Sequence, residues 1–411
     1  MKNQKCKGMK DFLPADMSAF RHVEKLFLDC CHNYGYQEVR TPTLEYLHLF
    51  TATGTLTPSM LSKIYSFLDW DGWSGERVVL RPDGTVPIAR LYVDRFSTLM
   101  TAKLCYVTNI FAFEATGQAN RERWQCGAEF IGGTRLAADV ETISLAKDVT
   151  EKSGINNINV QLSHAGLVKA LIKEIALNPE EETSLIDNVL EGNWQALIRK
   201  EEEVAGKFLP LLLNLRGKSR RFLQNIRTLY PQASPELKSH MDDFINITTL
   251  LDGLSFDYEI DITAIQNFEY YTGICFQLLA DGIKIGGGGR YDDLIPLMDG
   301  GNQPACGFAL YIDSILKSVS SDGRERQEQT ILITGNNIIP EMIKNYLVLA
   351  KSLRELGYSV DINFTKKELS EYRWIISACG EDMSSYDIVD QKQQQNWNAI
   401  SQAEVLKVLA Q

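Results

Sequence analysis

The sequence predicts an α+β fold, in which strand hairpins are interrupted by a helical insertion and followed by a small α/β domain. Three observations lead to this prediction. Short strand patterns joined by turn residues recur between residues 103 and 132 and again after residue 256. Between them, residues 165–250 carry apolar side chains at helical spacing and few glycines. Beyond residue 329 the order is strand, helix, strand, strand, which is typical of a small α/β domain.

The first elements follow from apolar spacing and turn residues. Residues 16–34 are a predicted helix, because an apolar stripe runs from Phe20 to Tyr34 and Gly35 stands where a helix would stop. GYQEVRTPTLEY is a predicted strand that ends near Pro42. RVVLRPDGTVPIARLYV predicts a strand, a tight turn at residues 82–84 and then a helix.

The middle of the chain alternates strands and helices. KLCYVTNIFAFE (103–114) and RWQCGAEFIG (123–132) are predicted to pair, residues 137–153 to form a helix and NINVQL (157–162) a strand. Strand character returns at FDYEIDIT (256–263), and YYTGICFQLLA, Asp-Gly and IKIGG predict a β-hairpin. CGFALYIDSILKSV (306–319) is interpreted as a further helix.

These elements predict two domains. Residues 1–320 form the first, with the helical insertion at about 165–250. The polar stretch SSDGRERQEQ (320–329) is a predicted linker, and residues 330–411 form a small α/β domain with a parallel sheet. QKQQQNWN (391–398) is interpreted as a polar surface segment.

Composition excludes several classes of protein. The chain has 44% hydrophobic and 23% charged residues, no run of eighteen apolar residues and no apolar N-terminal region, so we expect a cytoplasmic protein without a membrane span. Its eight cysteines show no C-x-x-C spacing and its five histidines do not cluster, so neither a metal nor a cofactor is expected. A net charge of −11 argues against a nucleic-acid surface.

Polar and aromatic residues on predicted strands and turns suggest a small-molecule pocket. On a strand, positions i and i+4 face one side, so Gln125 and Glu129 can enter the same cavity. Carboxylate, amide and phenol groups suit a ligand with an ammonium group and ring nitrogens. The candidate ligand-binding residues are Asp83, Thr85, Gln125, Glu129, Tyr270, Tyr271 and Tyr291. The alternative, that they are ordinary edge-strand residues and core tyrosines, remains open.

Other local patterns do not indicate catalysis. The glycine run at 286–289 has neither the Lys-Ser/Thr ending of a P-loop nor a G-x-G-x-x-G pattern. Four glycines more simply allow close approach of a ligand or a neighbouring strand. No nucleophile–base set can be assembled, so no catalytic residue is predicted.

Seven motifs in one order resemble the histidyl-tRNA synthetases, a class II family, over about 310 residues. They are KGMKDFLP (7–14), GYQEVRTPTLE (35–45), RPDGT (81–85), RERWQCGAE (121–129), YYTG (270–273), GGGGRYDDL (286–294) and CGFAL (306–310). The resemblance implies the class II fold, an antiparallel sheet flanked by helices, and dimerisation through the region around GYQEVRTP. It also implies that the candidate pocket binds histidine, with Asp83 in a place where the synthetases usually carry glutamate.

The sequence departs from this family at three arginine positions. Ala112 replaces the arginine expected to bind the α-phosphate of ATP, and Ser314 the one near the adenine and γ-phosphate. Gln266 stands where histidyl synthetases place an arginine before the paired tyrosines. ATP carries about four negative charges, and loss of one group that stabilises a transition state costs about 10²–10³ in rate. Arg121 and Arg123 remain nearby.

A histidine pocket without adenylation chemistry is similar to the family of ATP phosphoribosyltransferase regulatory subunits. This resemblance implies a non-catalytic protein that a short catalytic subunit needs for the first step of histidine biosynthesis, with histidine as feedback effector. It also implies a homodimer within a larger hetero-oligomer. Residues 330–411 carry eight Lys and Arg against ten Asp and Glu, net −2, which does not suit an anticodon-binding domain. The alternatives are an active histidyl-tRNA synthetase and a non-catalytic tRNA-binding module.

Overall fold

The computed structural model describes residues 4–53, 61–69, 75–113, 120–203, 220–229, 231–264, 270–318, 330–335, 340–363, 372–379 and 385–409. The chain divides into two compact units, Met1–Ser320 and Ser321–Gln411. The predicted linker at 320–329 lies outside the described residues. Nowhere in the described part of the chain is a helix both long and apolar enough to cross a membrane.

An eight-stranded sheet forms the centre of the first unit. Its spatial order is β1 (Gln37–Glu38), β5 (Ala102–Phe111), β6 (Glu122–Ile131), β11 (Ala305–Tyr311), β10 (Ile283–Arg290), β9 (Ile274–Ala280), β7 (Ile158–His164) and β8 (Glu259–Ile260). The six central strands pair antiparallel, and the two-residue strands at both edges pair parallel. The predicted hairpins are therefore present, and residues 281 and 282 make the β9–β10 turn with positive φ angles of 47° and 80°.

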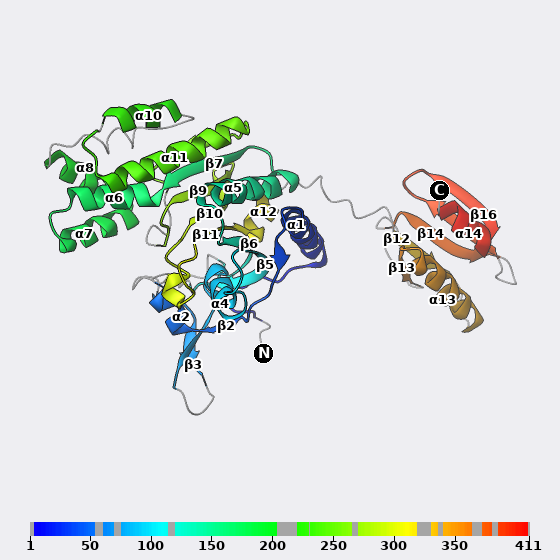
Figure 1. Cartoon of the computed structure of the whole chain (residues 1–411). Helices are drawn as coiled ribbons and strands as arrows, with labels where there is room; N and C mark the ends of the chain where they lie inside the picture. Colours follow the sequence, from blue (N-terminus) through cyan, green and yellow to red (C-terminus); the bar gives the residue numbers. More distant parts are fainter. Residues whose placement is uncertain are drawn as a thin grey trace. The chain divides into compact units, whose positions relative to one another are not determined.

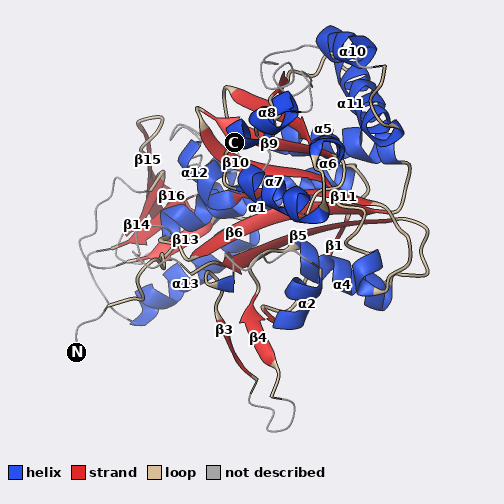
Figure 2. Cartoon of the chain, turned by 90° about the vertical axis from the view of Figure 1, so that its left-hand side faces the viewer, coloured by secondary structure: helices blue, strands red, loops and turns tan. Residues whose placement is uncertain are grey.

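Helices cover the two faces of this sheet unequally. Residues Cys126 and Ala128 of β6 belong to a large apolar core with α1 (Pro14–Asn33), α5 (Arg135–Lys152) and α12 (Ile312–Ser318). The opposite face packs against α4 (Thr85–Arg95), with Tyr106 of β5 in a second, smaller core. Figure 2 shows strands in red between blue helices. Because strand side chains alternate, alternate residues of β6 point towards α4, and these include Gln125 and Glu129.

The predicted insertion consists of helices that lie together in Figure 1. They are α6 (Ala165–Ile175), α7 (Pro179–Leu190), α8 (Trp194–Glu203), α10 (Arg220–Leu229) and α11 (Pro235–Gly253). Their starts match the sequence signals, since Asn178 and Ser234 cap α7 and α11 with a proline at the next position. The apolar faces of α6 and α11 join the large core.

A small three-stranded sheet belongs to the same unit. It has the order β2 (Leu44–Tyr46), β4 (Arg77–Leu80) and β3 (Ser66–Leu68), and all pairs are antiparallel. Strands β3 and β4 extend away from the large sheet in Figures 1 and 2. The short helix α2 (Leu47–Ala52) follows β2, and a 3₁₀ helix, η1 (Pro296–Met298), follows β10.

Three predicted elements of the first unit differ from the structure. The strand predicted to end near Pro42 is reduced to the two-residue β1, and Leu44–Tyr46 beyond it forms the separate strand β2. Residues 306–319 are not one helix, because Ala305–Tyr311 is strand β11 and only Ile312–Ser318 is helical. Strand β11 lies between β6 and β10 and is buried on both faces, so its apolar residues show no alternation that would mark a strand. The predicted strand at 256–263 pairs over only two residues, although Phe256, Tyr258, Ile260 and Ile262 are all buried as its pattern indicates.

The second unit is a five-stranded sheet with the order β13 (Ser359–Ile362), β12 (Thr330–Thr334), β14 (Trp374–Cys379), β15 (Ser385–Asp390) and β16 (Gln395–Ser401). Helices α13 (Pro340–Glu355) and α14 (Gln402–Leu409) pack on it. The expectation of a parallel sheet holds for β12, β13 and β14, but β15 and β16 add antiparallel. The polar stretch 391–398 contains a turn and the first residues of edge strand β16. Its hydrophobic alternation is weak, because an edge strand is largely exposed to solvent.

Candidate functional site

A polar cavity of about 250 Å³ lies on the α4 side of the large sheet. Its wall comprises the start of α4, strands β6, β9, β10 and β11, and the residues that precede β9. Six of the seven candidate residues line it, namely Asp83, Thr85, Gln125, Tyr270, Tyr271 and Tyr291. The seventh, Glu129, is only 1% exposed and contacts Tyr291 directly beneath this wall. The structure thus brings together all seven residues, which come from four separate stretches of the sequence.

The register of the central strands explains this arrangement. In the pairing of β6 with β11, Glu129 lies opposite Gly307 and Gln125 lies opposite Tyr311. A Cβ atom at Gly307 would lie 1.8 Å from Oε2 of Glu129, so only glycine leaves room for the carboxylate. Gly287 and Gly288 also line the cavity, and a Cβ at either would collide with a carbonyl oxygen of a neighbouring strand. The glycine run thus allows close approach of strands, as its composition predicts.

Glu129 is a buried acid directly behind the cavity wall. The Tyr291 hydroxyl donates a hydrogen bond to Oε2, and the Tyr106 hydroxyl donates one to Oε1 over 3.3 Å. Burial raises the pKa of Glu129 to about 8, although hydrogen bonds from Tyr291, Thr85 and Tyr106 favour the ionised form. At pH 7 the protonated form of this carboxyl group is therefore favoured. A neutral carboxyl can both donate and accept, which suits an imidazole ring.

Asp83 and Gln125 meet at the start of α4. The Val86 N–H donates to Oδ1 of Asp83 and the Gly84 N–H donates to Oε1 of Gln125, each over 3.0 Å. Burial raises the pKa of Asp83 to about 6, and the backbone hydrogen bonds from Val86 and Thr85 oppose that rise. At neutral pH Asp83 is thus ionised. Asp83 and Gln125 both line the cavity, and their oxygen atoms are acceptors of the kind that bind a ligand ammonium.

Three tyrosine rings form an aromatic wall of the cavity. The rings of Tyr270 and Tyr291 stack with centroids 4.9 Å apart and planes at 25°, and Tyr271 meets Tyr270 edge-on at 5.2 Å. The Tyr270 hydroxyl is buried and has no hydrogen-bond partner among the residues that the structure describes. Since a buried hydroxyl without a partner costs free energy, this group is ready to bind a polar atom of a ligand.

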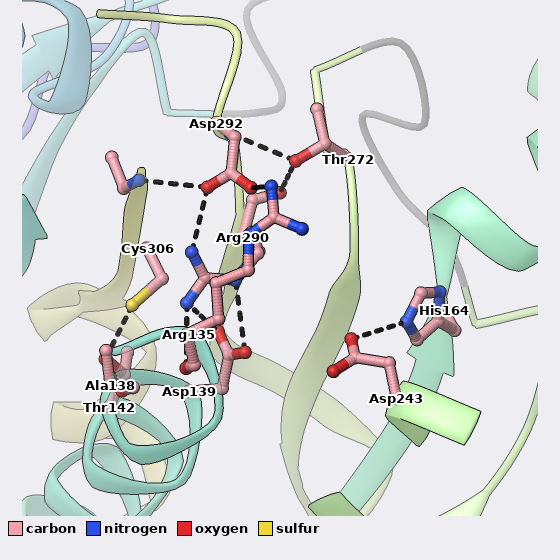
Figure 3. A network of polar contacts seen from close by, with 11 residues as sticks. Arg135, Ala138, Asp139, Thr142, His164, Asp243, Thr272, Arg290, Asp292 and Cys306 are labelled. Atoms are coloured by element: carbon pink, nitrogen blue, oxygen red, sulfur yellow. Dashed lines mark hydrogen bonds and ion pairs between the residues drawn. The ribbon is translucent and has the colours of Figure 1, made fainter. Parts of the chain in front are cut away.

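Arg290, the residue before Tyr291, is the centre of a network of ion pairs and hydrogen bonds (Figure 3). Its side chain is 3% exposed and makes two bonds to Asp139, of 2.8 and 3.1 Å, and one of 2.8 Å to Asp292. The Asp292 N–H donates to Oγ1 of Thr272 over 3.0 Å. The ion pair with Asp139 therefore ties the end of β10 to α5. The hydrogen bond from Asp292 to Thr272 ties the residues after β10, next to Tyr291, to those before β9, next to Tyr271.

Two cations also line the cavity. Arg123 of β6 lies over the Tyr311 ring with its guanidinium carbon 5.3 Å from the centroid. Lys284 of β10 was not among the predicted site residues, because Lys-Ile-Gly-Gly is an ordinary hairpin pattern. Burial lowers the pKa of Lys284 to about 8, and the charge of Arg123 adds to this effect. Arg81, another nearby cation, is already bound to backbone oxygens of Asn109, Thr41 and Pro42.

Two of the three lost arginine positions can be placed. Ala112 directly follows β5, and its N–H donates to the Arg121 carbonyl over 2.9 Å. Ser314 lies in α12. Gln266 is outside the described residues. The Arg121 guanidinium lies 4.8 Å from the centroid of the Phe113 ring. Within the described ranges, no three His, Cys, Asp or Glu side chains are grouped so as to hold a metal ion.

Comparison with known proteins gives a consistent result. The profile of the histidyl-tRNA synthetase family matches residues 8–315. An ATP phosphoribosyltransferase regulatory subunit from Dehalococcoides mccartyi is 43% identical over 411 residues, which are 99% of this chain and 98% of that protein. A histidine–tRNA ligase from Methanococcus vannielii is 31% identical over 390 residues, 90% of this chain and 88% of that protein.

Solved structures share the fold. One titled an ATP phosphoribosyltransferase regulatory subunit/histidyl-tRNA synthetase, from Bacillus halodurans, has a TM-score of 0.78 at 25% identity and covers 92% of this chain and 99% of its own. A histidyl-tRNA synthetase from a Nostoc species has a TM-score of 0.77 at 18% identity, over 100% of this chain and 99% of its own. The predicted class II synthetase-like sheet flanked by helices is therefore confirmed.

Proposed function

Because the chain belongs to the histidyl-tRNA synthetase family, and to the ATP phosphoribosyltransferase regulatory subunits within it, we propose that it regulates that transferase and is not itself an enzyme. Its partner is the short-form catalytic subunit, which needs it for activity in the first step of histidine biosynthesis. Histidine binds the cavity of the first unit and inhibits the complex. The chain acts as a homodimer within a larger hetero-oligomer.

One observation carries this proposal. Asp83 and Gln125 line the cavity and suit the ammonium of an amino acid, and Glu129 directly behind the wall suits its ring. Ala112 and Ser314, in contrast, stand where ATP-binding arginines are expected. Alanine and serine cannot provide the charged fork with which arginine binds phosphate. Loss of these groups removes adenylation much more than it removes amino-acid binding.

Feedback requires that histidine bind two states of the assembly unequally. A coupling of about 1–3 kcal/mol, or roughly 5–150-fold in affinity, is enough for this kind of control. Asp83 and Thr85 stand at the start of α4, whereas Tyr271 precedes β9, so the ligand would bridge parts of the fold that are far apart in sequence. A cytoplasmic location agrees with the eight cysteines, all of which are free thiols.

The test combines this chain with a short-form catalytic subunit. We expect the transferase to be much more active with the full chain than alone, and histidine to inhibit the complex. The same preparation should show no histidine-dependent ATP–pyrophosphate exchange. A catalytic subunit that is equally active alone would contradict the regulatory role, and robust exchange would indicate an active synthetase.

An active synthetase is the second candidate, because histidine–tRNA ligases are 31% identical to this chain over most of its length. Charging of histidine tRNA separates the two. The C-terminal unit carries a net charge of −2 over residues 330–411, so we expect weak tRNA binding without the steep salt dependence of phosphate contacts. Tight, salt-sensitive binding would favour a tRNA-binding role.

A further inference from the structure

A β-bulge turns Lys284 into the cavity. In the hairpin of β9 and β10, Gly287 pairs with Gln277 and Gly286 with Leu278, but Lys284 pairs with Leu279. Ile285 is therefore the extra residue, and the register shifts at this point. In a regular strand Lys284 and Gly287 would face opposite sides of the sheet, since they are three residues apart. Both line the cavity, because a bulge redirects the residues that precede it.

The position of Lys284 along the sheet follows from the same register. Leu310 pairs with Gly286, and its neighbour Tyr311 pairs with Gln125, so Lys284 lies near the level of Gln125. Glu129 is four residues further along β6, about 13 Å at the usual rise per residue. Glu129, behind the wall, and Lys284, in the wall, are thus separated along the sheet, and Lys284 lies near the level of Gln125.

Two cations that line one cavity repel each other, and burial makes both charges more costly. Desolvation already lowers the pKa of Lys284, and Arg123 lies on the same side of the sheet. An anion placed between these two cations would offset that cost. One carboxylate matches such a small cationic site better than a triphosphate of about four charges, which needs several arginine forks.

We propose that Lys284, with Arg123 beside it, binds the carboxylate of the amino acid and so makes the cavity selective for a zwitterion over an amine. This inference rests on the proposed histidine pocket and adds its third anchor. Gln266 replaces an arginine of the synthetases, and Lys284 on β10 would supply a positive charge to the pocket in its place. The ring then lies at Glu129 and Tyr270, and the ammonium at Asp83.

The test measures binding to the full chain by calorimetry, with histidine and with histamine, which lacks the carboxylate. We expect wild type to prefer histidine, and Lys284→Met to bind histidine about 10–100-fold more weakly while its histamine affinity is unchanged. Lys284→Arg should retain most of the histidine affinity, which separates charge from packing. Lys344→Met, at a side chain that is 71% exposed in the other unit, is the matched control and should behave as wild type.

The outcomes separate this inference from the proposed function. Failure of wild type to bind histidine overturns both. Normal histidine binding with an unchanged Lys284→Met overturns the carboxylate site alone, as does an equal loss of both ligands in Lys284→Met and Lys284→Arg. ATP binding that depends on Lys284, with histidine binding intact, would assign the cations to a phosphate and also overturn the inference.

Discussion

The carboxyl group of Glu129 accepts a hydrogen bond from the hydroxyl of Tyr291, at a point where both side chains are buried. Glu129 is on β6 and Tyr291 directly follows β10, two strands away across the sheet. The pair therefore links the buried acid behind the cavity to its aromatic wall. Because Tyr291 also stacks on Tyr270, Glu129 is connected through one hydrogen bond to two rings of this wall.

The first prediction concerns stability and pH. Burial raises the pKa of Glu129 from 4.5 to about 8, so the neutral acid stabilises the fold fully below pH 4.5 and this contribution is lost as the pH rises through 8. Its full size is roughly 5 kcal/mol at the upper limit. Glu129→Gln, which stays neutral, should therefore gain in melting temperature relative to wild type between pH 5 and pH 9. Thermal unfolding at several pH values measures this, and parallel curves would contradict it.

The second prediction concerns the ammonium site. Asp83→Asn keeps an oxygen for the Val86 N–H but loses the charge, so we expect it to bind histidine roughly 10–100-fold more weakly at pH 7.5. Because burial raises the pKa of Asp83 to about 6, the advantage of wild type should shrink as the pH falls through 6. Calorimetric titration of both proteins at pH 7.5 and 5 measures the difference. A gap that does not depend on pH would show that the Asp83 charge does not act on the ligand.

The third prediction concerns the Tyr270 hydroxyl. Because this group has no partner among the described residues, Tyr270→Phe should leave the free energy of unfolding unchanged or raise it, and weaken histidine binding about 5–10-fold. Tyr258→Phe is the matched control, since the Tyr258 hydroxyl donates to Asp252 over 2.8 Å. That variant should lose about 1 kcal/mol of stability and no affinity. Denaturant unfolding and calorimetry test both, and a reversed pattern would remove Tyr270 from the site.

The fourth prediction concerns Gly307. A Cβ atom there would lie 1.8 Å from the Glu129 carboxylate and 2.7 Å from the Ala128 carbonyl, so Gly307→Ala should destabilise the fold by about 1–3 kcal/mol and abolish ligand binding. Gly253→Ala is the control. Gly253 ends helix α11 with nothing within 4 Å of the added atom, so that variant should be neutral or gain up to about 1 kcal/mol. Equal stability of the two variants would contradict the packing at Gly307.

Much of this arrangement could be predicted from local patterns. Short-range signals in the sequence predict three of its features. These are the pairing of β5 with β6, the capped helices of the insertion and the Asp-Gly turn before β10. Strand β11 was predicted as part of a helix, because burial on both faces removes the hydrophobic alternation that distinguishes a strand from a helix. The antiparallel edge strand β16 was not predicted either, because its residues are mostly polar and exposed and show no hydrophobic alternation.

The sequence by itself determined the fold class, the elements and the residue types that an amino-acid pocket requires, because periodicity and turn chemistry act between near neighbours. Only the tertiary structure decided that Glu129 is buried enough to hold its proton, and that Lys284 faces the same cavity. The reason is physical: desolvation depends on everything packed around a group, and one extra residue in β10 reverses the side to which a lysine points.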